Sequence, residues 1–195
     1  MAMDVPFQEN LNNGRFETWT SKPQMHIKEA TQVHGTDIVS IETLPCEADG
    51  LLVSWEHFDH PLAIKTADCL PIVIEGEKGV IFLHAGWRGL TNGILKRPEI
   101  SMISPQRVFI GPSIHECCFE VSSDFKENFP DSPFFKKSGD KYYFNLQEEA
   151  KRQLREDFPS LLVQYAPICT SCNKSFHSYR RDKTSQRNWN LYIKG

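Results

Sequence analysis

Short apolar runs separated by turn residues recur through the middle of the chain. Residues 70–74 and 80–83 are almost entirely Leu, Ile, Val and Phe, and Gly-Glu-Lys-Gly lies between them. Runs of this length, rich in β-branched residues and bounded by glycine, are typical of two strands joined by a tight turn. The pattern therefore predicts a central β-hairpin, with a loop of residues 76 and 77 and with Glu75 paired to Lys78.

The register of this hairpin decides which side chains share a face. Counting outward from the pair of Glu75 and Lys78 places Cys69 opposite His84. Directly opposed residues have Cβ atoms about 5 Å apart on one face, whereas a slip of one residue would put them on opposite faces. A thiolate and an imidazole at that separation are suited to binding one metal ion, so we expect a functional site at this end of the hairpin.

Other apolar runs predict further strands on both sides of the hairpin. We expect them at residues 25–30, 38–41, 51–54, 108–110, 161–166 and 189–193. Residues 1–25 are weakly patterned, and residues 130–141 are expected to form a polar loop.

Three segments are expected to be helical. One covers residues 90–96 and ends before Pro98, and a short one, capped by Ser122 or Ser123, runs to residue 129. The third covers residues 146–158, where Asn145 and Glu148 resemble a capping pair. Its apolar positions repeat every four residues, at Leu146, Ala150, Leu154 and Phe158.

Composition and charge exclude several classes of protein. The 195 residues are 39% hydrophobic and 24% charged, as in a single globular domain. A formal net charge of -3 without a strongly basic block argues against nucleic acid as a partner. There is no apolar run long enough to span a membrane and no signal-peptide pattern at the N-terminus, so we expect a cytoplasmic protein without a membrane partner.

The cysteines are expected to be reduced thiols or metal ligands. A chain of this length without an export signal rarely carries a disulfide framework. Cys117 and Cys118 are adjacent, and a disulfide between neighbours would be strained, so both are expected to be free. Cys169 and Cys172 have the spacing of half a zinc knuckle, but no second C-x-x-C completes four ligands, so no structural zinc site is expected.

Several polar residues have both a functional and a structural interpretation. His34, beside Gly35, either faces a cleft or bonds to backbone in a turn. Arg88 follows Trp87 between two glycines, and either binds an anion or packs on that tryptophan. The basic cluster of residues 180–187 is either an anion clamp or a solvated face with a salt bridge to Asp182. Asp49 is expected to cap its own turn, Ala48-Asp49-Gly50, through the nearby backbone.

Six short blocks in fixed order resemble the YfiH-like family, which has been labelled both a laccase-type polyphenol oxidase and a purine nucleoside phosphorylase. The resemblance covers roughly residues 30–193. The blocks are Gln32-Val33-His34-Gly35, Ala48-Asp49-Gly50, Thr66-Ala67-Asp68-Cys69-Leu70-Pro71, His84-Ala85-Gly86-Trp87-Arg88-Gly89, Ile110-Gly111-Pro112-Ser113-Ile114, and Cys169-Thr170 with Ser178-Tyr179-Arg180-Arg181-Asp182.

The resemblance implies a fold, a metal and a chemistry. It implies one α/β domain over residues 1–195, with a layered mixed sheet flanked by helices and a shortened N-terminal region. It implies a zinc ion held by His34, Cys69 and His84, with copper as the alternative occupant. The implied substrates are a purine nucleoside and phosphate, in phosphorolysis of adenosine, inosine or methylthioadenosine, or in deamination of adenosine.

The same residues suggest individual roles. Two histidines and one cysteine leave one position of a tetrahedral zinc open, which is the catalytic pattern. Asp68 is either a proton shuttle beside Cys69 or a structural carboxylate. Phosphate is expected to meet Arg88 and Arg180, and Gln32 is expected to contact substrate.

Three rival functions use the same pattern. In the first, Cys69 is a nucleophile and His84 its base, in a hydrolase without metal. The second is a copper-dependent phenol oxidase, which seven histidines support poorly. The third is a ligand-binding homologue without catalysis.

Overall fold

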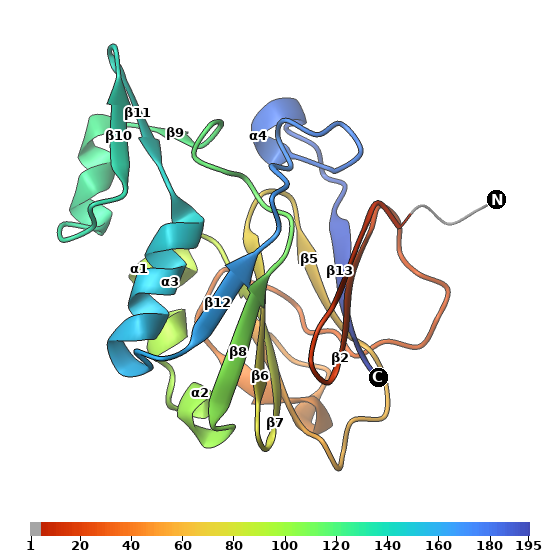
Figure 1. Cartoon of the computed structure of the whole chain (residues 1–195). Coiled ribbons are helices and arrows are strands. Elements are labelled where there is room, and N and C mark those ends of the chain that lie inside the picture. Colours follow the sequence, from red (N-terminus) through yellow and green to blue (C-terminus); the bar gives the residue numbers. More distant parts are fainter. Residues whose placement is uncertain (1–4) are drawn as a thin grey trace.

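A six-stranded mixed sheet forms the centre of the protein in the computed structural model, which describes residues 5–195 (Figure 1). Strands β12 and β8 are parallel, as are β3 and β4, and the other neighbours are antiparallel. In spatial order the strands are β12 (Leu162–Tyr165), β8 (Pro105–Ile110), β6 (Leu70–Gly76), β7 (Gly79–Ala85), β4 (Gly50–Ser54) and β3 (Ile38–Ser40).

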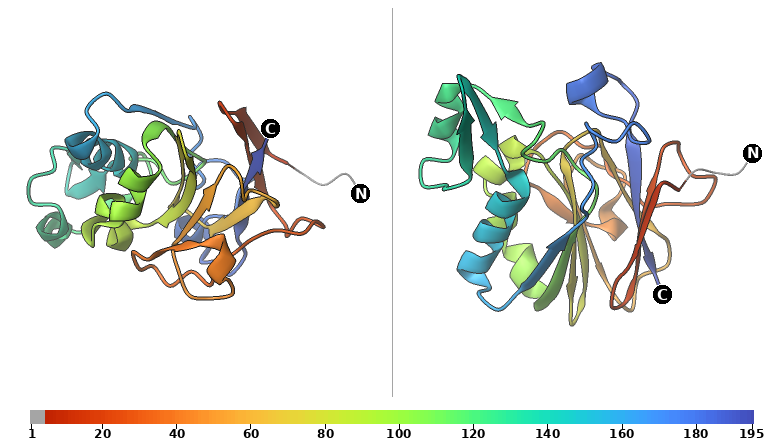
Figure 2. Two further views of the ribbon diagram at one scale, coloured as in Figure 1. Left: turned by 90° about the horizontal axis from the view of Figure 1, so that it is seen from below. Right: turned by 45° about the horizontal axis from the view of Figure 1, so that its top comes forward.

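A second, antiparallel sheet brings the two ends of the chain together. Its spatial order is β1 (Phe7–Asn10), β2 (Gly14–Trp19), β13 (Asn188–Lys194) and β5 (Leu62–Thr66). It packs on one face of the central sheet (Figures 1 and 2). A small third sheet consists of β10 (Phe135–Ser138), β11 (Lys141–Phe144) and β9 (Glu120–Val121).

Helices cover the other face of the central sheet (Figures 1 and 2). They are α1 (Trp87–Thr91), α2 (Pro98–Met102) and α3 (Leu146–Asp157), and α4 (Tyr179–Asp182) lies at one end of the sheet. In the described part of the chain, three 3-10 turns complete the helical segments: η1 (Ile41–Thr43), η2 (Ile94–Lys96) and η3 (Ser123–Asn128). The layered mixed sheet with flanking helices confirms the predicted fold class.

Within residues 5–195 no helix is long and apolar enough to cross a membrane.

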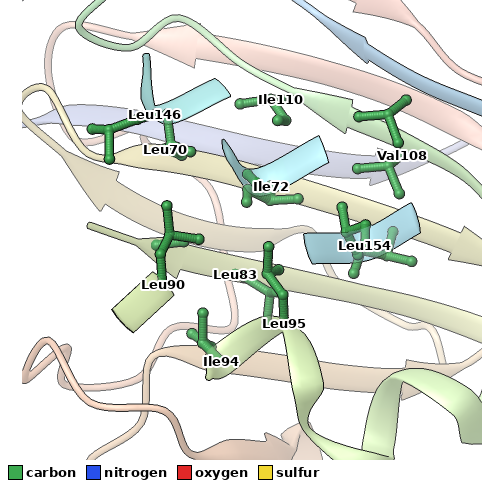
Figure 3. Packing of buried hydrophobic residues seen from close by; sticks show 14 of the residues in the cluster. Leu70, Ile72, Leu83, Leu90, Ile94, Leu95, Val108, Ile110, Leu146 and Leu154 are labelled. Carbon is green, nitrogen blue, oxygen red and sulfur yellow. The ribbon is translucent and has the colours of Figure 1, made fainter. Parts of the chain in front are cut away.

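Burial on both faces explains why the central strands read as continuous apolar runs. In β6, Ile72 faces the helices and packs in a cluster with Leu154 of α3 (Figure 3). Ile74 belongs to the same cluster. Val73, between them, packs against Phe16 of the second sheet. Alternate residues of one strand therefore belong to two different cores, and neither face tolerates a polar side chain without a partner.

The predicted central hairpin exists, but its predicted register is wrong by two residues. Glu75 pairs with Val80, and His84 lies opposite Pro71 rather than Cys69. The two residues between the strands are Glu77 and Lys78, so the turn lies one residue later than predicted. The amides of Glu77 and Lys78 donate to the carbonyls of Ser104 and Ile103, both at 3.1 Å. A shift of two residues keeps each side chain on its face, so Cys69 and His84 still point to the same side.

Several element boundaries also differ from the sequence predictions. Residues 25–30 form no strand, although Lys28 makes one bridge to Leu62. The weakly patterned N-terminal segment contains β1 and β2, and its residues 1–4 lie outside the described part. The predicted helix 90–96 is divided at Gly93, which adopts a positive φ of 83°. The predicted loop 130–141 contains β10.

The helix at residues 146–157 agrees closely with its prediction. The side chain of Asn145 accepts a hydrogen bond from the amide of Glu148 at 3.1 Å, as expected for a capping residue. Leu146, Ala150 and Leu154 are buried on the face that meets the central sheet.

A buried carboxylate ties the two larger sheets together. Glu75 of β6 is 2% exposed and accepts the hydroxyl of Tyr192 in β13 at 2.7 Å. It also accepts the amides of Asn12 and Asn13, both at 3.0 Å, in the turn between β1 and β2. Burial and the contact with Glu75 raise the pKa of Tyr192, so its hydroxyl remains a donor.

Glu75→Ala is expected to lower the free energy of unfolding by about 2–4 kcal/mol, because it leaves a buried hydroxyl and two amides without their acceptor. Urea denaturation measures the change. Glu77→Ala, in the exposed turn two residues away, is the matched control and should change stability by less than about 0.5 kcal/mol. Equal stability of both variants would contradict the proposed tie.

Candidate active site

Three potential metal ligands meet at one end of the central sheet. Cys69 immediately precedes β6, and His84 is near the end of the antiparallel neighbour β7. His34 lies in the loop before β3. One ligand atom from each residue lies within 4.8 Å of the other two, and the two imidazole rings are 4.7 Å apart and nearly perpendicular. The structure therefore brings together the three residues that the resemblance implied.

A buried carboxylate, Asp49, organises this cluster. Its Oδ1 lies 2.7 Å from Nδ1 of His84 and accepts the amide of His34 at 3.0 Å. Its Oδ2 accepts the amides of Val33 at 3.2 Å and Gly35 at 2.6 Å. One fully buried side chain thus fixes both the His34 turn and the orientation of the His84 ring.

Backbone conformation at the site supports the same conclusion. His34 adopts a positive φ of 61°, which is uncommon for a residue with a side chain. The three amides of residues 33–35 that bind Asp49 hold the chain in this conformation. The sequence interpretation has Asp49 capping its own turn at residues 48–50. Its carboxylate instead binds the distant turn at residues 33–35 and the ring of His84.

The charges of the cluster favour a thiolate. Burial would raise the pKa of the Cys69 thiol, but hydrogen bonds with His34 and His84 and the charge of these rings outweigh burial and lower it to about 6. Burial would lower the pKa of His84, but hydrogen bonds with Asp49 and Cys69 raise it to about 9. The thiolate is the form of cysteine that binds metals and acts as a nucleophile.

Gly86 gives the sulfur of Cys69 the room that it needs. A Cβ atom at residue 86 would lie 3.0 Å from Sγ of Cys69 and 3.8 Å from Cδ2 of His34. Any side chain there would press on the sulfur, so the glycine before Trp87 has a steric role at the site.

The donor set fits a zinc ion. Two imidazoles and one thiolate are ligand types that zinc prefers, and three protein ligands leave a fourth position open. The contact of Asp49 with Nδ1 of His84 leaves Nε2 as the ring nitrogen available to a metal, as in many carboxylate–histidine–zinc arrangements.

Asp68 links loops around the site. Its Oδ1 accepts the hydroxyl of Thr170 at 2.7 Å, and its Oδ2 accepts the amide of Arg180 at 2.6 Å. Its own carbonyl accepts the amide of Ile114 at 2.9 Å, and its φ is 93°. These contacts are those of the structural carboxylate, and a proton-shuttle role for Asp68 stays a hypothesis.

A cavity of about 770 Å³ opens beside the three ligands. It also reaches aromatic side chains and several cations, with Asp68 as the acidic residue in its lining. The aromatic residues in the lining are Trp87, Phe119 and Tyr179, and the cationic ones are Lys65, Arg88, Arg180, Lys183 and Arg187. Among residues 5–195, Arg88, Arg180, Lys183 and Arg187 form no ion pair with a carboxylate, so the cavity carries a positive charge suited to an anion.

The predicted binding residues line this cavity in different ways. Arg88 is exposed, and the central carbon of its guanidinium lies 4.6 Å from the centroid of the Trp87 ring. Arg180 donates from Nη1 to the carbonyl of Glu120 at 2.7 Å and lies over Phe119. Both polar atoms of the Gln32 side chain bind the backbone of Lys65 at 2.7 Å, so Gln32 joins its loop to β5.

Sequence reasoning did not identify Asp49 as the partner of His84, or Lys183 and Tyr179 as cavity residues. The position of Asp49 directly before β4, whose neighbour β7 carries His84, was the available signal. It becomes informative only when the pairing of β4 with β7 is known.

Asp49→Ala is expected to weaken metal binding about 10- to 100-fold, because the His84 ring and the His34 turn lose their common acceptor. Metal content after dialysis against a graded chelator series measures this. Glu47→Ala removes an exposed carboxylate two residues away and should leave metal retention unchanged. Equal retention in the two variants would show that Asp49 does not organise the cluster.

Comparisons with known proteins identify relatives over most of the chain. Residues 3–193 match the family described as multi-copper polyphenol oxidoreductase laccase. The chain is 33% identical to a purine nucleoside phosphorylase of Aquifex aeolicus (strain VF5), covering 89% of this chain and 84% of that protein. It is 31% identical to purine nucleoside phosphorylase YfiH of Escherichia coli (strain K12), covering 80% and 69%.

A solved structure shows the same fold. The crystal structure of Neisseria meningitidis protein NMB0706 aligns with a TM-score of 0.75 at 27% identity, covering 87% of this chain and 75% of that one. The family match extends over nearly the whole chain, and the six ordered blocks lie within it. The chain therefore belongs to the YfiH-like family.

Proposed function

We propose that the protein is a purine nucleoside phosphorylase that depends on a zinc ion held by His34, Cys69 and His84. The names of its relatives support an enzyme of the nucleoside-processing or polyphenol-oxidase type. The observation that carries the finer proposal is the combination of this donor set with an adjoining cavity that is both aromatic and cationic.

The cavity has a complementary surface for each part of the substrates. A purine base is planar and aromatic, and Trp87, Phe119 and Tyr179 offer rings for stacking and edge contacts. Inorganic phosphate carries negative charge at neutral pH, and the guanidinium of Arg88 presents a fork of donors toward it. The cavity volume of about 770 Å³ lies within the usual range for small-molecule sites.

Phosphorolysis breaks the bond between the base nitrogen and C1′ of the sugar, and a phosphate oxygen takes the place of the base. When bound, zinc would supply a Lewis acid with one open position. Arg88 and Lys183 hold the phosphate and balance its charge. Asp68 keeps the loops of Ile114 and Arg180 in place, and thereby shapes the wall against which the nucleoside rests.

A second candidate is a cysteine hydrolase without metal. The specific observation in its favour is the chain of contacts from Asp49 through His84 to Cys69, which has the order of an orienting carboxylate, a base and a nucleophile. A ring nitrogen of His34 also lies within 4.8 Å of the same sulfur, and this favours the metal instead, because a nucleophile needs no second imidazole at its sulfur.

Phenol oxidation with copper is less well supported by the residues. Within residues 5–195, the groups of side chains that could hold a metal are this trio and a cluster of four cysteines. Neither is the histidine-rich set that a multicopper oxidase requires, so copper chemistry would rest on one ion in the zinc position.

Purified protein is expected to release purine base from adenosine, inosine or methylthioadenosine in the presence of phosphate. His34→Ala, Cys69→Ser and His84→Ala should each lower kcat/KM by more than about 100-fold and reduce the metal content, because each removes one of three ligands. Chromatography of the products together with elemental analysis measures both. His57→Ala, which removes an exposed histidine bonded to Ser54, is the control and should retain both.

The products distinguish the rival functions. Inosine and ammonia formed from adenosine without phosphate would assign deamination to the site. Full activity of metal-free protein, with rapid alkylation of Cys69 that stops turnover, would assign the cysteine hydrolase. Phosphorolysis retained in His84→Ala would contradict the zinc proposal.

Arg88→Ala is expected to raise the KM for phosphate about 10- to 100-fold with a smaller change in the KM for nucleoside, because it removes a charge-assisted contact to one substrate. Steady-state kinetics with each substrate varied in turn measures this. Arg155→Ala, on the exposed face of α3, is the matched control. An unchanged KM for phosphate would remove Arg88 from the proposed anion site.

A further inference from the structure

Four cysteines converge outside the cavity described above. Cys117 and Cys118 lie in the loop that follows β8, and Cys169 and Cys172 lie in the loop that follows β12. Because β8 and β12 are parallel neighbours, both loops leave the same end of the sheet (Figure 1). The loops are also joined by backbone: Ser113 bridges Cys169, and the amide of Thr170 donates to the carbonyl of Ser113 at 3.0 Å.

The four sulfur atoms have the spacing of a tetrahedral metal site. All lie within 4.8 Å of one another. The Sγ atom of Cys117 is 3.8 Å from that of Cys118 and 3.6 Å from that of Cys172. The Sγ atoms of Cys118 and Cys172 are 3.2 Å apart. Zinc–sulfur bonds of about 2.3 Å place the sulfurs of a regular tetrahedron about 3.8 Å apart, so modest side-chain adjustment would close the site.

A backbone amide and a lysine side chain lie beside the sulfur atoms. The amide of His115 donates to Sγ of Cys169 at 3.4 Å. Lys174 lies beside the cluster and adds positive charge.

We propose that Cys117, Cys118, Cys169 and Cys172 bind a second zinc ion in a closed, structural site. The sequence analysis did not expect this site because it required a second C-x-x-C. The structure supplies the other two ligands from adjacent cysteines on a neighbouring strand end. Four thiolates complete the tetrahedron and leave no open position, which is the pattern of structural rather than catalytic zinc.

The site would hold two walls of the cavity in place. The loop of Cys117 and Cys118 also carries Ile114 and Phe119, which line the cavity. The loop of Cys169 and Cys172 receives the guanidinium of Arg181, which donates to the carbonyls of Thr170 at 2.8 Å and Ser171 at 3.2 Å. A zinc ion between the two loops would therefore fix α4 relative to the loop after β8.

The alternative for these residues is redox chemistry, in which Cys118 and Cys172 form a disulfide. All six cysteines are free in this structure. A disulfide and a zinc ion compete for the same sulfurs, so counting thiols and metal in one preparation distinguishes them.

The test is the zinc content of untagged protein purified under reducing conditions without added metal. Wild type should contain two zinc ions per chain, and Cys117→Ser and Cys172→Ser should each contain one. Cys46→Ser, at a cysteine outside both clusters, is the control and should contain two. Cys69→Ser should lose the other zinc ion and keep the ion at the four cysteines. If the proposed function fails, only the zinc ion at Cys69 should be missing from the wild type, and if this site fails, only the ion at the four cysteines should be missing.

Two measurements on the wild type keep the test independent of variant folding. Cobalt(II) substituted for zinc should give the visible absorption bands of a four-thiolate tetrahedral site. Exposed Cys117 and Cys172 should resist a thiol reagent in the native protein and react after a chelator removes the metal. One zinc ion per chain in wild type and in Cys172→Ser, two fewer free thiols in denatured protein, or iron in place of zinc would each overturn the proposal.

Discussion

The structure depends on one buried carboxylate at the end of the central sheet. Asp49 binds three consecutive amides of the His34 turn and the Nδ1 of His84. A buried charge is unfavourable unless it is fully hydrogen-bonded, so the residues around Asp49 have little freedom to rearrange. Two of those residues, His34 and His84, are proposed ligands. The hydrogen bonds that stabilise the buried charge of Asp49 therefore also hold these two ligands in position.

The layered architecture explains why so much chemistry gathers at one edge. β4 and β6 begin there, and β7, β8 and β12 end there. Both faces of the central strands are covered, by helices on one side and by the second sheet on the other. Polar side chains are therefore displaced to the strand ends, where loops can satisfy them and where the cavity opens.

The sequence predicted what depends on local patterns and missed what depends on pairing. The apolar runs at 70–74 and 80–83 located the central hairpin, and Asn145 located the start of α3. The predicted register was wrong because the amides of Glu77 and Lys78 bind the carbonyls of distant Ser104 and Ile103, and the turn lies one residue later than the local pattern predicts. His34, Cys69 and His84 were found through motifs, whereas the contact of Asp49 with His84 and the meeting of four cysteines require the strand order.

The most direct test of this account is an anomalous difference map, recorded at the zinc absorption edge, from crystals of protein purified without added metal. The account predicts a peak within bonding distance of the imidazoles of His34 and His84 and the sulfur of Cys69, with Asp49 still bound to Nδ1 of His84. Crystals of protein that turns over purine nucleosides, with no peak at these three side chains, would contradict it.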